Sequence, residues 1–155
     1  MRTVLALALA LVLLSVAEAP RVAEAERANA SPAQLQKGAT HIVLGTVKAV
    51  YTRTETKGGW RVTRYVAEVE VVKSEKGDLA KGQLAYVRYW QQQWLRRTPQ
   101  PPSASGHHAI PKEGETLRIY AVNQGDNRLG RTTDGGLDVI GPNGFERPAK
   151  ATGGR

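Results

Sequence analysis

The chain has 155 residues, contains no cysteine and carries a formal net charge of +8. The absence of cysteine excludes disulfide bonds, a thiol nucleophile and a cysteine-linked lipid anchor. The basic balance favours an anionic partner such as an acidic polysaccharide, anionic lipid or nucleic acid, or else it serves solubility alone.

The N-terminus has the layout of a secretory signal peptide. A positively charged start precedes an uncharged apolar run over residues 3–16, and small-residue cleavage patterns then end at Ala25 and Ala30. The apolar run is shorter than the roughly 20 residues of a membrane-spanning helix, so a retained anchor is the weaker alternative. We therefore expect residues 1–25 to be a signal peptide, cleavage after Ala25 or Ala30, and a secreted or periplasmic protein without a transmembrane segment.

The folded domain is expected to begin with a short helix over residues 31–38. Ser31 suits the N-cap, Pro32 suits the first helical position and Gln34 completes a capping box. Gly38 suits a left-handed residue at the helix end.

Two strands follow the helix, over residues 40–52 and 60–73. In the second, apolar β-branched and aromatic side chains recur with a period of two, which is typical of a half-buried strand. Gly45 interrupts the first strand and predicts a bulge or bend. Gly58 and Gly59 predict the hairpin turn between the two strands.

A third strand is expected over residues 83–90. If it pairs antiparallel with the second, Glu68 can face Arg88 and Glu70 can face Tyr86, a register that keeps the apolar faces together. Arg88 would then belong to a cross-strand ion pair, which is the alternative to a ligand-binding role.

The segment over residues 91–112 differs in kind, because it contains four prolines and two adjacent histidines. Residues 91–97 are compatible with a helical turn that Pro99 ends. A connection of this length is uncommon in a small domain and is usually functional or disordered.

Two further strands, over residues 115–122 and 137–140, complete the pattern, and residues 148–155 are expected to form a disordered tail. Five hairpin-connected strands favour a mainly β fold, a small five-stranded OB-like barrel over residues 31–147 with a short N-terminal helix. A β-sandwich is the alternative, but it would want about seven strands.

Several short motifs extend this interpretation. A short helix leads into residues 39–47 (ATHIVLGTV), and residues 69–73 (VEVVK), Gly77 and Gly114-Glu115 follow in order. This pattern resembles the TIMP/netrin-like OB-fold superfamily, including cysteine-free exported bacterial members of unknown function. The resemblance implies an OB fold and an extracytoplasmic location. It implies no site, because the tissue inhibitors act through an N-terminal cysteine that this chain lacks.

An aromatic and basic cluster is the strongest candidate site. OB-type domains often bind oligonucleotides or oligosaccharides across the second and third strands, and stacking with flanking cations suits either polymer. The alternative is that the tryptophans cover the barrel as a satellite core and only the arginines meet water. The candidate ligand-binding residues are Tyr86, Arg88, Trp90, Trp94, Arg96, Arg97, His107 and His108.

Metal and hydrolytic sites are less favoured. Adjacent residues in an extended chain point opposite ways, so His107 and His108 are expected to be an exposed loop pair, with His41 the third histidine. Ser103 and Ser105 share the loop with the pair, but no G-x-S-x-G elbow is present. We expect no catalytic residue, no metal and no cofactor.

The sequence thus predicts an exported, non-enzymatic OB-fold binding module for an acidic polymer or an envelope partner. The expected partner is an anionic polysaccharide or an envelope protein, and nucleic acid is less favoured. The alternative is a structural or assembly protein that docks through residues 91–112. A small hydrolase or metal-binding protein is the weakest of the three.

Overall fold

The computed structural model describes residues 28–101, 105–123 and 136–148. The expected signal peptide, residues 1–25, and residues 149–155 of the expected tail lie outside this part of the chain. Within it, no helix has both the length and the apolar character to cross a membrane.

The helix α1 (Pro32–Gly38) forms where the capping signals predict it. Ser31 Oγ accepts a hydrogen bond from the Gln34 N–H at 3.2 Å, and Gln34 Oε1 accepts one from the Ser31 N–H at 2.7 Å. The prediction of a left-handed Gly38 is wrong, because the chain leaves the helix through Ala39 in an extended conformation, with φ −72° and ψ 137°. The extended exit leads straight into the first strand, so no chain reversal is needed.

The strands of the described residues are β1 (His41–Lys57), β2 (Trp60–Lys76), β3 (Leu84–Trp94), β4 (Thr116–Asn123), β5 (Leu137–Val139) and β6 (Phe145–Glu146). The five predicted strands are all present, and the two-residue β6 is an addition. β1 continues five residues beyond its predicted end, to Lys57. Residues 91–94 extend β3, so the predicted helical turn is wrong.

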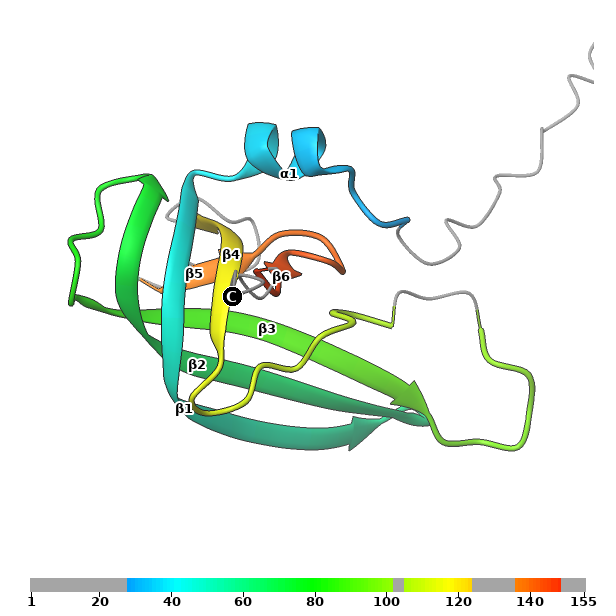
Figure 1. The fold of residues 1–155 in the computed structure, drawn as a ribbon. Coiled ribbons are helices and arrows are strands. Elements are labelled where there is room, and N and C mark those ends of the chain that lie inside the picture. Colours follow the sequence, from blue (N-terminus) through cyan, green and yellow to red (C-terminus); the bar gives the residue numbers. More distant parts are fainter. Residues whose placement is uncertain (1–27, 102–104, 124–135, 149–155) are drawn as a thin grey trace, which may run out of the picture.

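Five of the strands close into a ring. β1 pairs antiparallel with β2 and β4, β2 with β3, and β4 with β5, whereas β3 and β5 are parallel. The hydrogen-bonded order is β1–β2–β3–β5–β4 and back to β1, with β6 beside β4 (Figure 1). This confirms the predicted fold class, a mainly β, five-stranded OB-like barrel with a short N-terminal helix.

Glycines shape the first hairpin at two places. The register between β1 and β2 shifts between Leu44 and Gly45, and a Cβ atom at Gly45 would lie only 2.3 Å from Val69 Cγ1. The predicted bulge is confirmed, and the glycine there lets β2 approach closely. Gly58 and Gly59, with φ of 62° and 92°, form the predicted two-residue turn, since both positions require positive φ.

The register of the second hairpin differs from the prediction. Glu68, not Glu70, lies opposite Tyr86, and Val66, not Glu68, lies opposite Arg88. The prediction is wrong by two residues, because the apolar alternation fixes only the face of each side chain, and the midpoint of the hairpin lies at Gly77 rather than at Asp78. A shift of two residues leaves each side chain on its predicted face.

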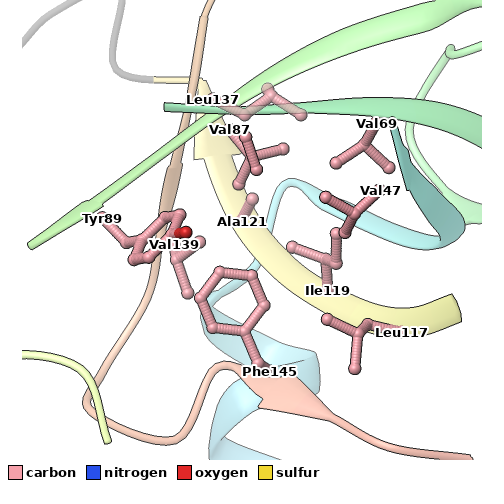
Figure 2. Packing of buried hydrophobic residues seen from close by; sticks show 11 residues of the cluster. Val47, Val69, Val87, Tyr89, Leu117, Ile119, Ala121, Leu137, Val139 and Phe145 are labelled. Carbon is pink, nitrogen blue, oxygen red and sulfur yellow. The ribbon is translucent and has the colours of Figure 1, made fainter. Parts of the chain in front are cut away.

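Apolar side chains from every strand fill the interior of the barrel (Figure 2). The ring of Phe145 meets Tyr89 edge-on at 5.0 Å, so β6 contributes to the same core as the ring strands. The members of this core are Val47, Ala67, Val69, Val87, Tyr89, Leu117, Ile119, Ala121, Leu137, Val139 and Phe145.

A second, smaller cluster holds α1 against the barrel, where Leu35 packs with Ile42 of β1 and Tyr120 of β4. The chain just before the helix is fixed by two hydrogen bonds. The Ala30 N–H donates to Asn143 Oδ1 at 3.1 Å, and Asn143 Nδ2 donates to the Ala30 carbonyl at 2.9 Å. Asn143 therefore binds the backbone of Ala30 much as a neighbouring strand would.

Candidate functional site

The three longest strands continue beyond the closed ring. β1 pairs with β4 only as far as Thr46, and β3 pairs with β5 only at Val87 and Arg88. Past these points β1, β2 and β3 go on as a three-stranded sheet, which Figure 1 shows extending away from α1 and β4. We call its far part, residues 51–64 and 90–98, the distal ribbon.

The distal ribbon carries most of the net charge of the described residues. Its one carboxylate is Glu55, and its cations are Arg53, Lys57, Arg61, Arg64, Arg96 and Arg97, a net +5. The rest of the described residues hold nine cationic and eight acidic side chains, a net +1. Many of those are joined in ion pairs such as Lys48–Glu70. Positive charge is thus concentrated at one end of the molecule.

The cations of the distal ribbon are poorly matched by acids. Among the described residues its one ion pair joins Arg64 and Glu55, and neither Arg53 nor Arg61 has such a partner. Arg53 lies directly opposite Arg64 on the neighbouring strand, an arrangement in which like charges are destabilising. Glu55, which pairs with Arg64, is the one carboxylate of the distal ribbon that can offset this repulsion.

One face of the distal ribbon carries all three tryptophans, and we call it the tryptophan face. Trp60 lies opposite Trp94, and Arg64 lies opposite Trp90. The rings of Trp60 and Trp94 are 4.9 Å apart, and the Arg96 guanidinium lies 5.7 Å from the Trp94 ring. All three tryptophans are half-buried, so they are neither a sealed satellite core nor fully exposed platforms.

The opposite face, which we call the groove face, borders an open groove of about 490 Å³. The groove is lined by one guanidinium, several amides, hydroxyls and imidazoles, and by no carboxylate. Its lining residues are Arg61, Thr63, Tyr65, Gln91, Gln92, Gln93, Ser105, His107 and His108.

His107 fixes one wall of this groove. Its side chain is only 7% exposed, its Nε2 donates to the Val139 carbonyl at 3.1 Å, and its Nδ1 lies 3.2 Å from the Trp90 N–H. Its own N–H donates to the Trp90 carbonyl at 2.8 Å. The expectation of an exposed pair is therefore wrong for His107, because ring and backbone tie it to β3 and β5. His108 is exposed.

Arg88 takes part in closing the barrel. Its Nε lies 3.2 Å from Asp138 Oδ1, and its Nη2 donates to Asp138 Oδ2 at 3.4 Å and to the Gly136 carbonyl at 3.1 Å. The predicted Glu68–Arg88 pair is wrong, because the ion-pair partner of Arg88 is Asp138. Asp138 lies beside Arg88 in the parallel β3–β5 register, a contact between residues 50 positions apart.

The other predicted site residues do not all converge. Tyr86 is exposed near the ring, eight strand residues from Trp94, or about 26 Å at roughly 3.3 Å per residue. Trp94 and Arg96 lie together on the distal ribbon with the exposed Arg97. His108 borders the groove instead.

The described residues assemble no metal centre, and His107 is not placed to act on a serine. They contain no group of three or more metal-ligating side chains. His41 lies elsewhere, with Nε2 3.1 Å from Asp78 Oδ1, and this hydrogen bond lowers the pKa of Asp78. Both ring nitrogens of His107 face backbone groups, which leaves neither to activate Ser105. Ser103 lies outside the described residues.

Trp60 and Arg61 are not among the candidate site residues, because the apolar alternation that follows them indicates only a half-buried strand. In the structure Trp60 packs on Trp94, and Arg61 lines the groove. The pairing of β2 with β3 brings them there. To identify Trp60 and Arg61 as site residues, one would need the correct register between β2 and β3, in which Trp60 lies opposite Trp94 and Arg61 opposite Gln93.

Comparisons of the chain with protein-family models, with curated proteins and with solved structures give no match. The class of protein is therefore described by its fold and its surface. The chain is a small OB-like barrel whose first three strands continue into a cationic ribbon, with tryptophans on one face and a polar groove on the other.

Proposed function

We propose that the protein is an exported, non-enzymatic binding module whose distal ribbon binds an anionic polymer. The observation that carries the proposal is the separation of charge, with six cations and one carboxylate on the distal ribbon and a near balance elsewhere in the described residues. Charge used for solubility alone would need no such concentration. A cationic surface raises the local concentration of anions and speeds their association.

The position of the distal ribbon in the fold supports the same function. OB-type barrels often bind oligosaccharides and oligonucleotides across the second and third strands. Here β2 and β3 supply the tryptophans and most of the groove lining, and Arg96 follows two residues after the end of β3. Half-buried aromatic rings next to guanidinium groups suit a polymer that combines flat surfaces with negative charge.

We also propose that the protein belongs to the TIMP/netrin-like superfamily. The ring of five strands and the capped helix that leads into β1 fit that pattern. Together with the N-terminal signal-peptide layout they support an extracytoplasmic location. The inhibitory mechanism of the tissue inhibitors does not carry over, because the chain has no cysteine.

A docking role for residues 91–112 has less support. Residues 91–94 belong to β3. Further along, the Gln92 N–H donates to the Ser105 carbonyl at 2.9 Å, and Gln91 and Gly106 form a β-bridge. Gln91, Gln92 and Ser105 are therefore held by this pairing, whereas residues 95–101 are exposed, so only part of the segment is open to a partner.

The first prediction is that the protein binds a sulfated polysaccharide such as dextran sulfate in a salt-sensitive way. Titration should change the tryptophan fluorescence, because Trp60 and Trp94 lie on the distal ribbon. Raising NaCl from about 50 to about 300 mM should weaken binding by screening the charges. The double variant Arg96→Ala/Arg97→Ala should weaken it by about tenfold, which corresponds to about 1.4 kcal/mol.

The matched control is Lys73→Ala/Lys81→Ala, which removes two exposed cations outside the distal ribbon. It should weaken binding by about threefold or less, the effect of net charge alone. The proposal fails if no salt-sensitive response is seen, or if the two double variants weaken binding equally.

A further inference from the structure

We infer that the groove face binds carboxylate-bearing sugar units, so that the preferred polymer is a polyuronate. This inference rests on the proposed function and adds the chemical class of the polymer and the residues that recognise it. It is carried by the composition of the groove, in which one guanidinium stands among amides and hydroxyls and no carboxylate lines the walls.

Arg61 supplies the recognition of charge. It lies opposite Thr56 on β1 and Gln93 on β3, and within the described residues no acid pairs with it. Strand alternation places Arg53 and Arg64 on the other face, so Arg61 is the one guanidinium of the groove lining. A guanidinium binds a carboxylate through two parallel hydrogen bonds. A single guanidinium therefore suits a ligand with one carboxylate on each ring.

The other polar groups of the groove suit sugar hydroxyls. Gln91 Nε2 donates to the His107 carbonyl at 2.7 Å, which fixes this amide. Thr63 Oγ1 lies 3.3 Å from Thr54 Oγ1, and Gln93 is exposed. Amides and hydroxyls both donate and accept hydrogen bonds, as sugar hydroxyls do. The groove can therefore match a hydroxyl-rich ligand without adding charge.

Tyr65 gives the groove an aromatic wall held in a fixed position. Its ring is stacked on the buried Tyr89, with centroids 4.8 Å apart and an angle of 4° between the planes. The volume of the groove, about 490 Å³, lies within the roughly 300–1,000 Å³ of small-ligand sites. The aromatic wall offers the apolar C–H face of a sugar ring a packing surface.

The same groove fits nucleic acid less well. Single-stranded nucleic acid is bound by successive aromatic platforms and by cations that follow its phosphates. The groove lining has one phenol ring, that of Tyr65, and one guanidinium, that of Arg61, beside the imidazoles. The tryptophans lie on the opposite face of the ribbon, so they cannot extend this row.

The test uses two single variants that form a matched pair, Arg61→Gln and Arg53→Gln. Each removes one exposed arginine from the distal ribbon, the first from the groove face and the second from the tryptophan face. The probes are an oligogalacturonate of uniform length, its methyl ester, dextran sulfate and a single-stranded oligonucleotide, each titrated by calorimetry. Circular dichroism establishes that both variants keep the fold.

The wild-type protein should bind the oligogalacturonate and should bind the methyl ester far more weakly. Arg61→Gln should weaken binding of the acid by about tenfold or more, the loss of one charge-assisted pair, and Arg53→Gln by about threefold or less. Dextran sulfate should respond equally to the two variants, because it senses net charge.

Equal losses for the oligogalacturonate in both variants would overturn the inference and leave the proposed function in place. Binding of the methyl ester as tight as that of the acid would overturn it too. So would a single-stranded oligonucleotide that binds more tightly and depends on Arg61. Failure of every polyanion to bind would overturn the inference and the proposed function together.

Discussion

Arg88 and Asp138 join the two strands that close the ring. The guanidinium reaches both carboxylate oxygens and the Gly136 carbonyl, and the two side chains are 21% and 28% exposed. Hydrogen bonds between charged groups in such a setting contribute more than an exposed surface pair. At the scale of the residue, Arg88 is engaged in the fold rather than offered to a ligand.

Replacing Arg88 with alanine should therefore lower the free energy of unfolding by about 1–3 kcal/mol, since Asp138 and the Gly136 carbonyl lose their donors. Urea unfolding measures the change. Arg97→Ala, an exposed arginine on the distal ribbon, should change stability by about 0.5 kcal/mol or less. Unchanged stability of Arg88→Ala, with loss of polyanion binding, would instead assign Arg88 to the ligand.

The same pair shows which contacts the sequence could not predict. The alternation along β3 places Arg88 on the outer face, and this was correct. Its partner comes from a parallel strand 50 residues away, and no local pattern encodes that pairing. The burial of His107 has the same origin, since its ring bonds to Val139 in β5.

At the scale of the element, the sequence predicts those helix ends and turns that are determined by interactions between residues close together in the chain. The capping box of Ser31 and Gln34 gives the start of α1, and the paired glycines give the β1–β2 turn. The extension of β3 was missed because residues 91–93 are three glutamines, which show no apolar alternation. Their pairing with β2 holds them in the strand, and it places all three of them along the groove.

The attachment of α1 gives a prediction at this scale. Asn143→Ala removes both hydrogen bonds to Ala30, so the free energy of opening the helix should fall by about 1–2 kcal/mol. Hydrogen exchange of the Leu35 amide, which bonds to the Ser31 carbonyl, reports the opening. Asn143→Asp keeps the acceptor and should have an intermediate effect. Unchanged exchange would show that the apolar cluster alone holds the helix.

The two hydrogen bonds between Asn143 and Ala30 also distinguish the consequences of the two predicted cleavage sites. Cleavage after Ala25 leaves Ala30 and both of its hydrogen bonds in the mature chain. Cleavage after Ala30 removes them and places a new positively charged amino group at the N-terminus of α1, the end that the helix dipole disfavours for a cation.

At the scale of the whole molecule, the C-terminal strands complete both the core and the ring. Leu137, Val139 and Phe145 are all buried. Burial of one such side chain contributes about 1.5–3 kcal/mol, so the three together contribute about 5–9 kcal/mol. This is comparable with the entire stability of a typical small domain, about 5–15 kcal/mol.

A chain truncated after Gly136 should therefore fail to fold, as judged by circular dichroism and by the loss of a cooperative urea transition. Truncation after Pro148 removes only part of the tail that the sequence predicts to be disordered, and it should change stability by about 0.5 kcal/mol or less. A cooperative transition in the shorter chain would show that β1 to β4 form a stable unit alone.

The closure of the ring also sets the shortest time in which the barrel can form during synthesis. His41 of β1 pairs with Ala121 of β4, so the first strand waits for a partner 80 residues further along the chain. At a synthesis rate of about 5–20 residues per second, that wait lasts about 4–16 s. Folds dominated by such distant contacts also close slowly once complete, over milliseconds to seconds. The closed barrel therefore cannot form until several seconds after β1 has been synthesised, although β1 can pair with β2 before then.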